Sequence, residues 1–173
     1  MSEEKAKWIL QVEDLTQKAA ASEGCIMYDL EFVGIGAGRT LRVYIDKADG
    51  IVSIDDCSNV SKNLNQQLDE NDVVPGGPYH LEVSTPGLDR HLKLPWHFAK
   101  VVGKKIWLKT AQPLEVYGNQ DKKWKNAKTV EQVLTAVDDL GLRFLVDEVQ
   151  INVPFQAIEK AKLVFEMVKG QKK

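Results

Sequence analysis

The sequence predicts an α+β protein with two domains, an N-terminal two-layer α-β-β-α-β domain and a small C-terminal all-β barrel. Three observations support this prediction. The first half of the chain combines helical and strand periodicities, the second half carries several short strand patterns, and a strand ending at Pro86 and Gly87 lies between them. We therefore expect the domains at residues 1–90 and 91–173.

The first predicted element is an amphipathic helix over residues 3–23. Glutamates lie in its first turn and Gly24 follows its last residue, as is typical of helix ends. Its apolar residues recur at spacings of three and four, and they are Trp8, Ile9, Val12, Leu15 and Ala19.

A β-hairpin is predicted next, with the glycine-rich residues 34–39 as its connection. Its first strand places Ile26, Tyr28, Leu30 and Phe32 on one face, and its second strand turns Leu41, Val43 and Ile45 inward. The glycines do not match a dinucleotide-binding fingerprint, because Arg39 stands at the third glycine position and a strand follows instead of a helix.

A second helix is predicted from Ser53, which forms a capping-box pattern with Asp56. Its expected apolar stripe is Ile54, Cys57, Val60, Leu64 and Leu68. A Pro-Gly-Gly-Pro loop at residues 75–78 then leads to a strand containing Leu81 and Val83. This element order is KH-like, but this half lacks the G-x-x-G loop with which KH domains clamp nucleic acid.

The predicted junction between the halves is residues 81–92, LEVSTPGLDRHL. Pro86 suits the first central position of a β-turn, and Gly87 can adopt the positive φ that a type II turn requires next. Asp89 and Arg90 follow as neighbours of opposite charge. They form either an exposed ion pair worth about 0 to 1 kcal/mol, or a contact point held rigidly at the end of a sheet.

The second half is predicted to be all β apart from a short helix that begins at Pro95, runs through Phe98 and Ala99, and closes before Gly103. Five short strands fit a closed barrel better than an open sheet, because closure removes exposed edges. They are expected at residues 104–110, 130–138, 141–147, 149–154 and 161–165, with a tight turn at Asp138-Asp139-Leu140-Gly141.

A loop over residues 112–128 is longer than a hairpin needs and surrounds one aromatic residue with lysines, as Lys122, Lys123, Trp124, Lys125 and Lys128. Basic side chains can contact phosphates while an exposed ring stacks on a base. The alternative is a solvated loop whose tryptophan folds back onto the barrel. The sequence leaves both interpretations open.

Charge is unevenly distributed along the chain. Residues 1–94 contain 9 Lys and Arg against 16 Asp and Glu, a net charge of −7, whereas residues 95–173 contain 14 against 9, a net charge of +5. A basic domain suits a phosphate backbone, and an acidic domain suits a basic protein.

Other features argue against an enzyme or a membrane protein. The apolar runs are short and the N-terminus is acidic, so we expect neither export nor membrane insertion. Cys25 and Cys57 form no metal or redox motif, and we expect reduced thiols in the cytoplasm. His80, His91 and His97 match no metal pattern, so we expect no catalytic, cofactor-binding or metal-binding residues, which disfavours a hydrolase or transferase.

Three separated motifs together resemble the RimP family of bacterial ribosome maturation factors: LEVSTPGLDRHL, HFAKVVGKKIWL and INVPFQAIEKAKLVFE. The resemblance covers nearly the whole chain and implies an N-terminal α/β domain with a C-terminal Sm-like barrel. It also implies a cytoplasmic, non-enzymatic factor for maturation of the small (30S) ribosomal subunit. The implied partners are the immature subunit, its rRNA, and a basic ribosomal protein near the decoding region.

Residue by residue, the interdomain signature of the family falls on Ser84, Thr85, Pro86, Gly87, Leu88, Asp89 and Arg90. Its closing barrel motif falls on Pro154, Phe155, Ile158, Lys160 and Ala161. His91 stands where the family more often has proline, which implies a less rigid linker. The loop around Trp124 is enlarged, so the family assigns it no role.

We therefore expect the acidic first half and the turn at residues 85–90 to receive the ribosomal protein. Lys104, Lys105 and Lys109, together with the loop lysines, are expected to approach rRNA phosphates. The alternative function is an Sm-like RNA-binding regulator that acts on transcripts as a ring. A domain preceding the barrel would obstruct such a ring, so we expect a monomer.

Overall fold

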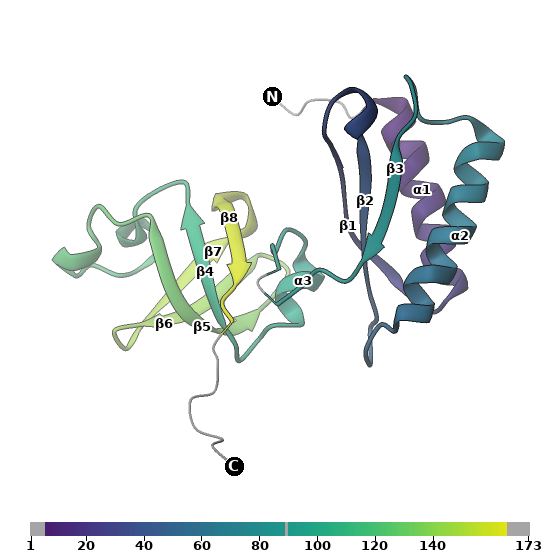
Figure 1. Cartoon of the computed structure of the whole chain (residues 1–173). Helices are drawn as coiled ribbons and strands as arrows, with labels where there is room; N and C mark the ends of the chain where they lie inside the picture. Colours follow the sequence, from purple (N-terminus) through teal and green to yellow (C-terminus); the bar gives the residue numbers. More distant parts are fainter. Residues whose placement is uncertain (1–5, 89, 166–173) are drawn as a thin grey trace, which may run out of the picture. The chain divides into compact units, whose positions relative to one another are not determined.

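The computed structural model describes residues 6–88 and 90–165. The chain divides into two compact units, residues 1–86 and 87–173 (Figure 1). Each unit has a separate hydrophobic core.

The first unit has the predicted α-β-β-α-β order. Its elements are α1 (Lys7–Ser22), β1 (Ile26–Val33), β2 (Thr40–Asp46), α2 (Ile54–Asn71) and β3 (His80–Ser84). β1 and β2 are antiparallel, whereas β2 and β3 are parallel, which gives the sheet order β1-β2-β3. A parallel pair needs a long crossover, and α2 provides it. Both helices lie on one face of the sheet (Figure 1).

The core of the first unit lies between its sheet and its helices. The strand period of two and the helical period of three to four bring apolar side chains of β2 and α2 to this interface. They are Leu41, Val43, Ile45, Val60, Leu64 and Leu68, all buried. Complete burial of one such side chain stabilises a fold by about 1.5–3 kcal/mol, so this layer is the main stabilising contact of the unit.

Both predicted helices differ from expectation in detail. Ile54, the first residue of α2, is 86% exposed instead of continuing the buried stripe. In α1, Thr16 is fully buried, and its hydroxyl donates a hydrogen bond to the carbonyl of Val12 at 2.7 Å. Glu3 and Glu4, expected in the first turn of α1, lie outside the described residues.

The prediction that Ile26 shares one face of β1 with Leu30 and Phe32 is wrong, although Tyr28 is buried. The register of β1 against β2 shifts between Met27 and Asp29, which marks a β-bulge. As a result Met27, not Ile26, lies opposite the buried Ile45, and Ile26 is 40% exposed. The expected inward-facing residues that pack against the core are Leu30 and Phe32.

The predicted capping box at the start of α2 is confirmed. Ser53 Oγ accepts a hydrogen bond from the Asp56 N–H at 3.0 Å, and Asp56 Oδ2 accepts one from the Ser53 N–H at 2.9 Å. Asp56 Oδ2 also lies 2.8 Å from Lys47 Nζ. The hydrogen bond from Lys47, followed by that from the Ser53 backbone, lowers the pKa of Asp56 to about 2.

The second unit contains the five strands predicted for it. Its elements are α3 (Pro95–Ala99), β4 (Lys105–Thr110), β5 (Thr129–Val137), β6 (Gly141–Val146), β7 (Val149–Pro154) and β8 (Ile158–Leu163). The strands pair antiparallel in the order β7-β6-β5-β4-β8. β8 begins earlier than predicted, because a 3-10 turn at Phe155–Ala157 reverses the chain and Ile158 already pairs with Thr110. Closure into an Sm-like barrel stays a prediction.

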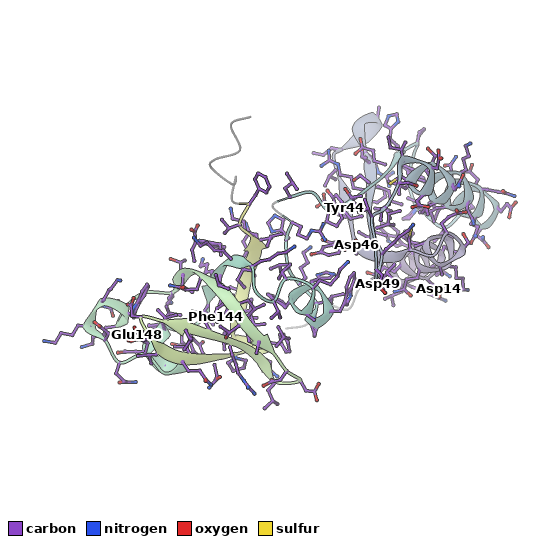
Figure 2. All side chains as sticks on the ribbon, turned by 90° about the horizontal axis from the view of Figure 1, so that it is seen from below. Asp14, Tyr44, Asp46, Asp49, Phe144 and Glu148 are labelled. Atoms are coloured by element: carbon purple, nitrogen blue, oxygen red, sulfur yellow. The ribbon has the colours of Figure 1, made fainter. Side chains whose placement is uncertain are left out.

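The core of the second unit lies on one face of this sheet. Its fully buried side chains include Ile106, Leu108, Leu134 and Phe144, the last of which is labelled in Figure 2. At Gly141, a Cβ atom would collide with the carbonyl oxygen of Val153 on β7. Glycine therefore permits the close approach of β6 and β7 at the predicted tight turn.

Residues 90–92 belong to the second unit. The Leu92 N–H donates to the Ala161 carbonyl, and the Leu163 N–H donates to the Arg90 carbonyl, both at 2.9 Å. This bridge pairs His91 with Lys162, and the division between the units accordingly falls between Pro86 and Gly87. Neither hydrogen bond uses the His91 N–H, so a proline at that position would leave both in place.

Candidate nucleic-acid interface

The predicted interdomain residues begin where β3 ends. Gly87 adopts a φ of 85°, the left-handed conformation that the sequence predicted for it. The Nε of Arg90 donates a hydrogen bond to the Gly87 carbonyl at 3.2 Å, across the turn. Leu88 is 64% exposed between them. Asp89 lies outside the described residues.

The lysines predicted to contact RNA lie in two parts of the second unit. Lys104 precedes β4, and Lys105 and Lys109 lie on the outer face of β4, because Ile106 and Leu108 face the core. Lys109 Nζ is 3.4 Å from Glu159 Oε2 on β8, and both side chains are about half exposed. The remaining lysines, Lys122, Lys123, Lys125 and Lys128, lie on the loop between β4 and β5.

That loop is folded onto the second unit. It contains two 3-10 turns, Leu114–Tyr117 and Lys122–Trp124. Asn119 is 1% exposed, and its Nδ2 donates to the Val146 carbonyl at 2.9 Å. Because a buried amide must be hydrogen-bonded, this contact anchors the centre of the loop to the end of β6.

Trp124 contacts the turn that follows β6. Its ring packs against the core of the second unit, and its Nε1 donates to Asp147 Oδ2 at 2.7 Å. Lys123 Nζ lies 3.5 Å from the same oxygen. The hydrogen bond from Trp124 and the charge of Lys123 lower the pKa of Asp147. Of the two interpretations of the loop, the structure agrees with the one in which Trp124 folds back onto the second unit. An RNA contact by its ring stays a prediction.

Sequence reasoning assigned no RNA contact to three residues on the outer face of the second unit. Trp107 lies between Lys105 and Lys109, and Lys162 and Lys160 lie opposite Trp107 and Lys109 on β8. The signal was present in the sequence KIWLKT, where inward-facing Ile and Leu on both sides of the tryptophan require it to face outward.

In the first unit, the sheet face opposite the helices is polar and acidic. Tyr44 (Figure 2) donates its hydroxyl to Glu31 Oε1 at 2.8 Å. The Nε of Arg42 lies 3.0 Å from Glu82 Oε2 on β3. Burial and the bond to Glu31 raise the pKa of Tyr44, and the hydrogen bond to Glu82 raises the pKa of Arg42. Glu31 Oε1 also lies 3.9 Å from Arg42 Nη1, and Asp29 lies opposite Tyr44, so this face carries three carboxylates and one guanidinium.

The three histidines do not form a common site. His97 is buried, and its Nδ1 accepts hydrogen bonds from the N–H groups of Lys93 and Leu94 at 3.1 and 3.2 Å, which supports the start of α3. His80 and His91 are exposed and belong to different units. Among the described residues, no cluster of His, Cys, Asp or Glu is suited to a metal ion, and no helix is long and apolar enough to cross a bilayer.

Residues 15–89 match the family model of the RimP N-terminal domain. The first unit therefore carries the N-terminal domain of the RimP family, the family that the sequence motifs predicted. The match runs from α1 past β3, so the acidic sheet face lies within the RimP domain.

The lysines of the second unit lie beyond the residues matched to the RimP domain. The family match therefore gives them no role. An assignment of these lysines to RNA has to rest on their charge, their exposure and their position on the sheet.

Proposed function

We propose that this protein is a non-enzymatic assembly factor that binds the immature small ribosomal subunit in the cytoplasm. In this proposal the second unit binds small-subunit rRNA, and the first unit binds a basic ribosomal protein near the decoding region. The observation that carries the proposal is the RimP N-terminal domain at residues 15–89.

The division of charge between the units supports two partners of opposite charge. Residues 1–86 contain 7 Lys and Arg against 15 Asp and Glu, a net charge of −8. Residues 87–173 contain 16 against 10, a net charge of +6. Complementary charge speeds encounter and disfavours wrong partners, so each unit favours a different component of the ribosome.

For the first unit, we assign the ribosomal protein to the acidic sheet face and the turn that follows it. Arg42 holds the Glu82 carboxylate in place, and Tyr44 holds that of Glu31. Fixed carboxylates can accept bidentate hydrogen bonds from arginines of a partner without first losing side-chain freedom. The proposed contact continues from Ser84 through Arg90, which begin two residues after Glu82 in the chain.

For the second unit, we assign rRNA phosphates to Lys104, Lys105, Lys109 and the loop lysines around Trp124. We propose that its five strands form an Sm-like barrel, so that these lysines stand on a rigid support. Lys109 and Lys123 lie in exposed ion pairs. Such pairs contribute only about 0 to 1 kcal/mol, so both lysines can exchange their carboxylates for phosphates.

Binding of this kind needs no covalent chemistry. A factor that binds one arrangement of the rRNA more tightly than another increases the population of that arrangement in proportion to the difference in affinity. Because its two units contact rRNA and protein together, the factor favours the arrangement in which both sites are correctly spaced. It is expected to act as a monomer.

Charge reversal tests the rRNA assignment. The triple variant Lys104→Glu, Lys125→Glu and Lys128→Glu should weaken binding to a small-subunit rRNA fragment and flatten its salt dependence. The matched control reverses Lys7, Lys18 and Lys62, which are exposed on α1 and α2, and changes the net charge equally. Equal losses of affinity in both triple variants would mean that only the total charge matters and would contradict the assignment.

A further inference from the structure

The outer face of the sheet in the second unit carries one aromatic side chain among lysines. Ile106 and Leu108 are fully buried, so Trp107 between them faces outward and is only partly buried. On the adjacent strand β8, Lys162 lies opposite Trp107 and Lys160 lies opposite Lys109. We call Trp107, Lys109, Lys160 and Lys162 the Trp107 face.

The cations of the Trp107 face can be exchanged for a ligand. Lys162 Nζ lies 5.6 Å from the centroid of the Trp107 ring, a cation–π contact that is weak at an exposed site. Within the described part of the chain, neither Lys160 nor Lys162 forms an ion pair with a carboxylate. Glu131, which lies opposite Trp107, is on β5, the side of the ring away from the two β8 lysines.

This combination of ring and cations suits single-stranded RNA better than a duplex. A base in a single strand can leave its neighbours and lie on an aromatic ring, whereas the faces of duplex bases are covered by stacking. Lysine ammonium groups beside the ring attract the flanking phosphates. Trp124 differs from Trp107, because its ring packs against the core, its Nε1 is bonded to Asp147, and the lysine over its ring, Lys123 at 4.8 Å, pairs with the same carboxylate.

We propose that the Trp107 face binds single-stranded RNA, with one base stacked on the Trp107 ring in place of the Lys162 ammonium and with the face's lysines on the adjacent phosphates. This inference rests on the proposed function, in which the second unit binds rRNA. It adds the form of the RNA and the residue that receives a base.

Fluorescence anisotropy with the full-length protein tests the inference. The ligands are a labelled oligouridine, whose bases stack weakly on one another, the same oligomer with abasic sites, and an RNA duplex of equal length. Trp107→Thr removes the ring and keeps a β-branched residue suited to a strand. Trp107→Phe keeps a ring. The matched control Leu145→Thr shortens a side chain that is 52% exposed on β6 of the same sheet.

The wild-type protein should bind the oligouridine about tenfold more tightly than the abasic oligomer, from the contribution of one stacked base. Trp107→Thr should abolish this difference, whereas Trp107→Phe and Leu145→Thr should retain most of it. Lys160→Gln with Lys162→Gln should weaken both oligomers similarly, because phosphates are common to them.

Equal wild-type affinity for the two oligomers, or tighter binding of the duplex, would overturn base stacking on Trp107 and leave phosphate binding by the second unit intact. Failure of the wild-type protein to bind any RNA at low salt would overturn the rRNA part of the proposed function as well. The wild-type comparison needs no variant, so the test remains decisive even if Trp107→Thr does not fold.

Discussion

The indole Nε1 of Trp124 donates a hydrogen bond to the Asp147 carboxylate at 2.7 Å, although the two residues are 23 positions apart. This bond fastens the long loop between β4 and β5 to the two-residue turn between β6 and β7. The basic loop is thereby a fixed part of the second unit, and its lysines occupy defined positions.

Replacing Trp124 with phenylalanine keeps an apolar ring against the core but removes the indole donor. Because Asp147 is partly exposed, we expect a loss of about 1 kcal/mol in the free energy of unfolding, measured by urea denaturation. In an Asp147→Ala background the same substitution should cost clearly less, because the acceptor is already absent. The same cost in both backgrounds would show that the bond contributes nothing.

Asp56 should titrate at an unusually low pH. Its pKa is lowered from 3.8 to about 2, so in this range the unfolded chain binds more protons than the folded one. The stabilisation is fully present above pH 3.8 and is lost as the pH falls through about 2. An NMR titration of the Asp56 carboxyl group should give a midpoint near 2.

Two variants identify the cause of this shift. Lys47→Met should move the midpoint of Asp56 upward more than Ser53→Ala does, because the hydrogen bond from Lys47 is the largest contribution and Ser53→Ala keeps the backbone donor. A wild-type midpoint near 3.8 would contradict the hydrogen-bonded geometry at the start of α2.

The turn between β6 and β7 offers a stabilising substitution. Asp147 and Glu148 have φ of 50° and 66°, the pattern of a type I′ turn, and Glu148 lies at its tip (Figure 2). Left-handed backbone costs a non-glycine residue about 1–2 kcal/mol, and glycine adopts it freely. Glu148→Gly should therefore raise the free energy of unfolding by about 0.5–1 kcal/mol, after the added entropy of the unfolded chain is subtracted.

The control for this substitution is Glu131→Gly on β5, where the backbone is an ordinary strand. There glycine should lower stability by roughly 0.5–1 kcal/mol. Denaturation of both variants and of the wild type shows whether each substitution raises or lowers the free energy of unfolding. A loss of stability in Glu148→Gly would argue against the left-handed turn.

Local patterns in the sequence were sufficient for much of the fold. The period of β2, the capping box at Ser53 and Asp56, and the proline at the start of α3 depend on neighbours within a few residues, and all are present in the structure. The bulge beside Tyr28 was not predictable, because it arises from the register between two strands and leaves the alternation of residue types unchanged.

The candidate site was less accessible to sequence reasoning. The position of Trp124 depends on Asp147, and the pairing of Lys162 with Trp107 depends on β8 lying beside β4. Both are long-range contacts with no local signature. The outward orientation of Trp107 was the exception, since the alternation along KIWLKT already required it.

The central claim is that the protein binds the small ribosomal subunit while that subunit is still immature. Co-sedimentation tests it most directly, with purified protein added at moderate salt to immature small subunits, mature small subunits and large subunits. We expect retention on the immature small subunits alone, reduced in the variant with Lys104, Lys125 and Lys128 reversed but not in the variant with Lys7, Lys18 and Lys62 reversed. Equal retention on all three particles, or on none, would contradict the claim.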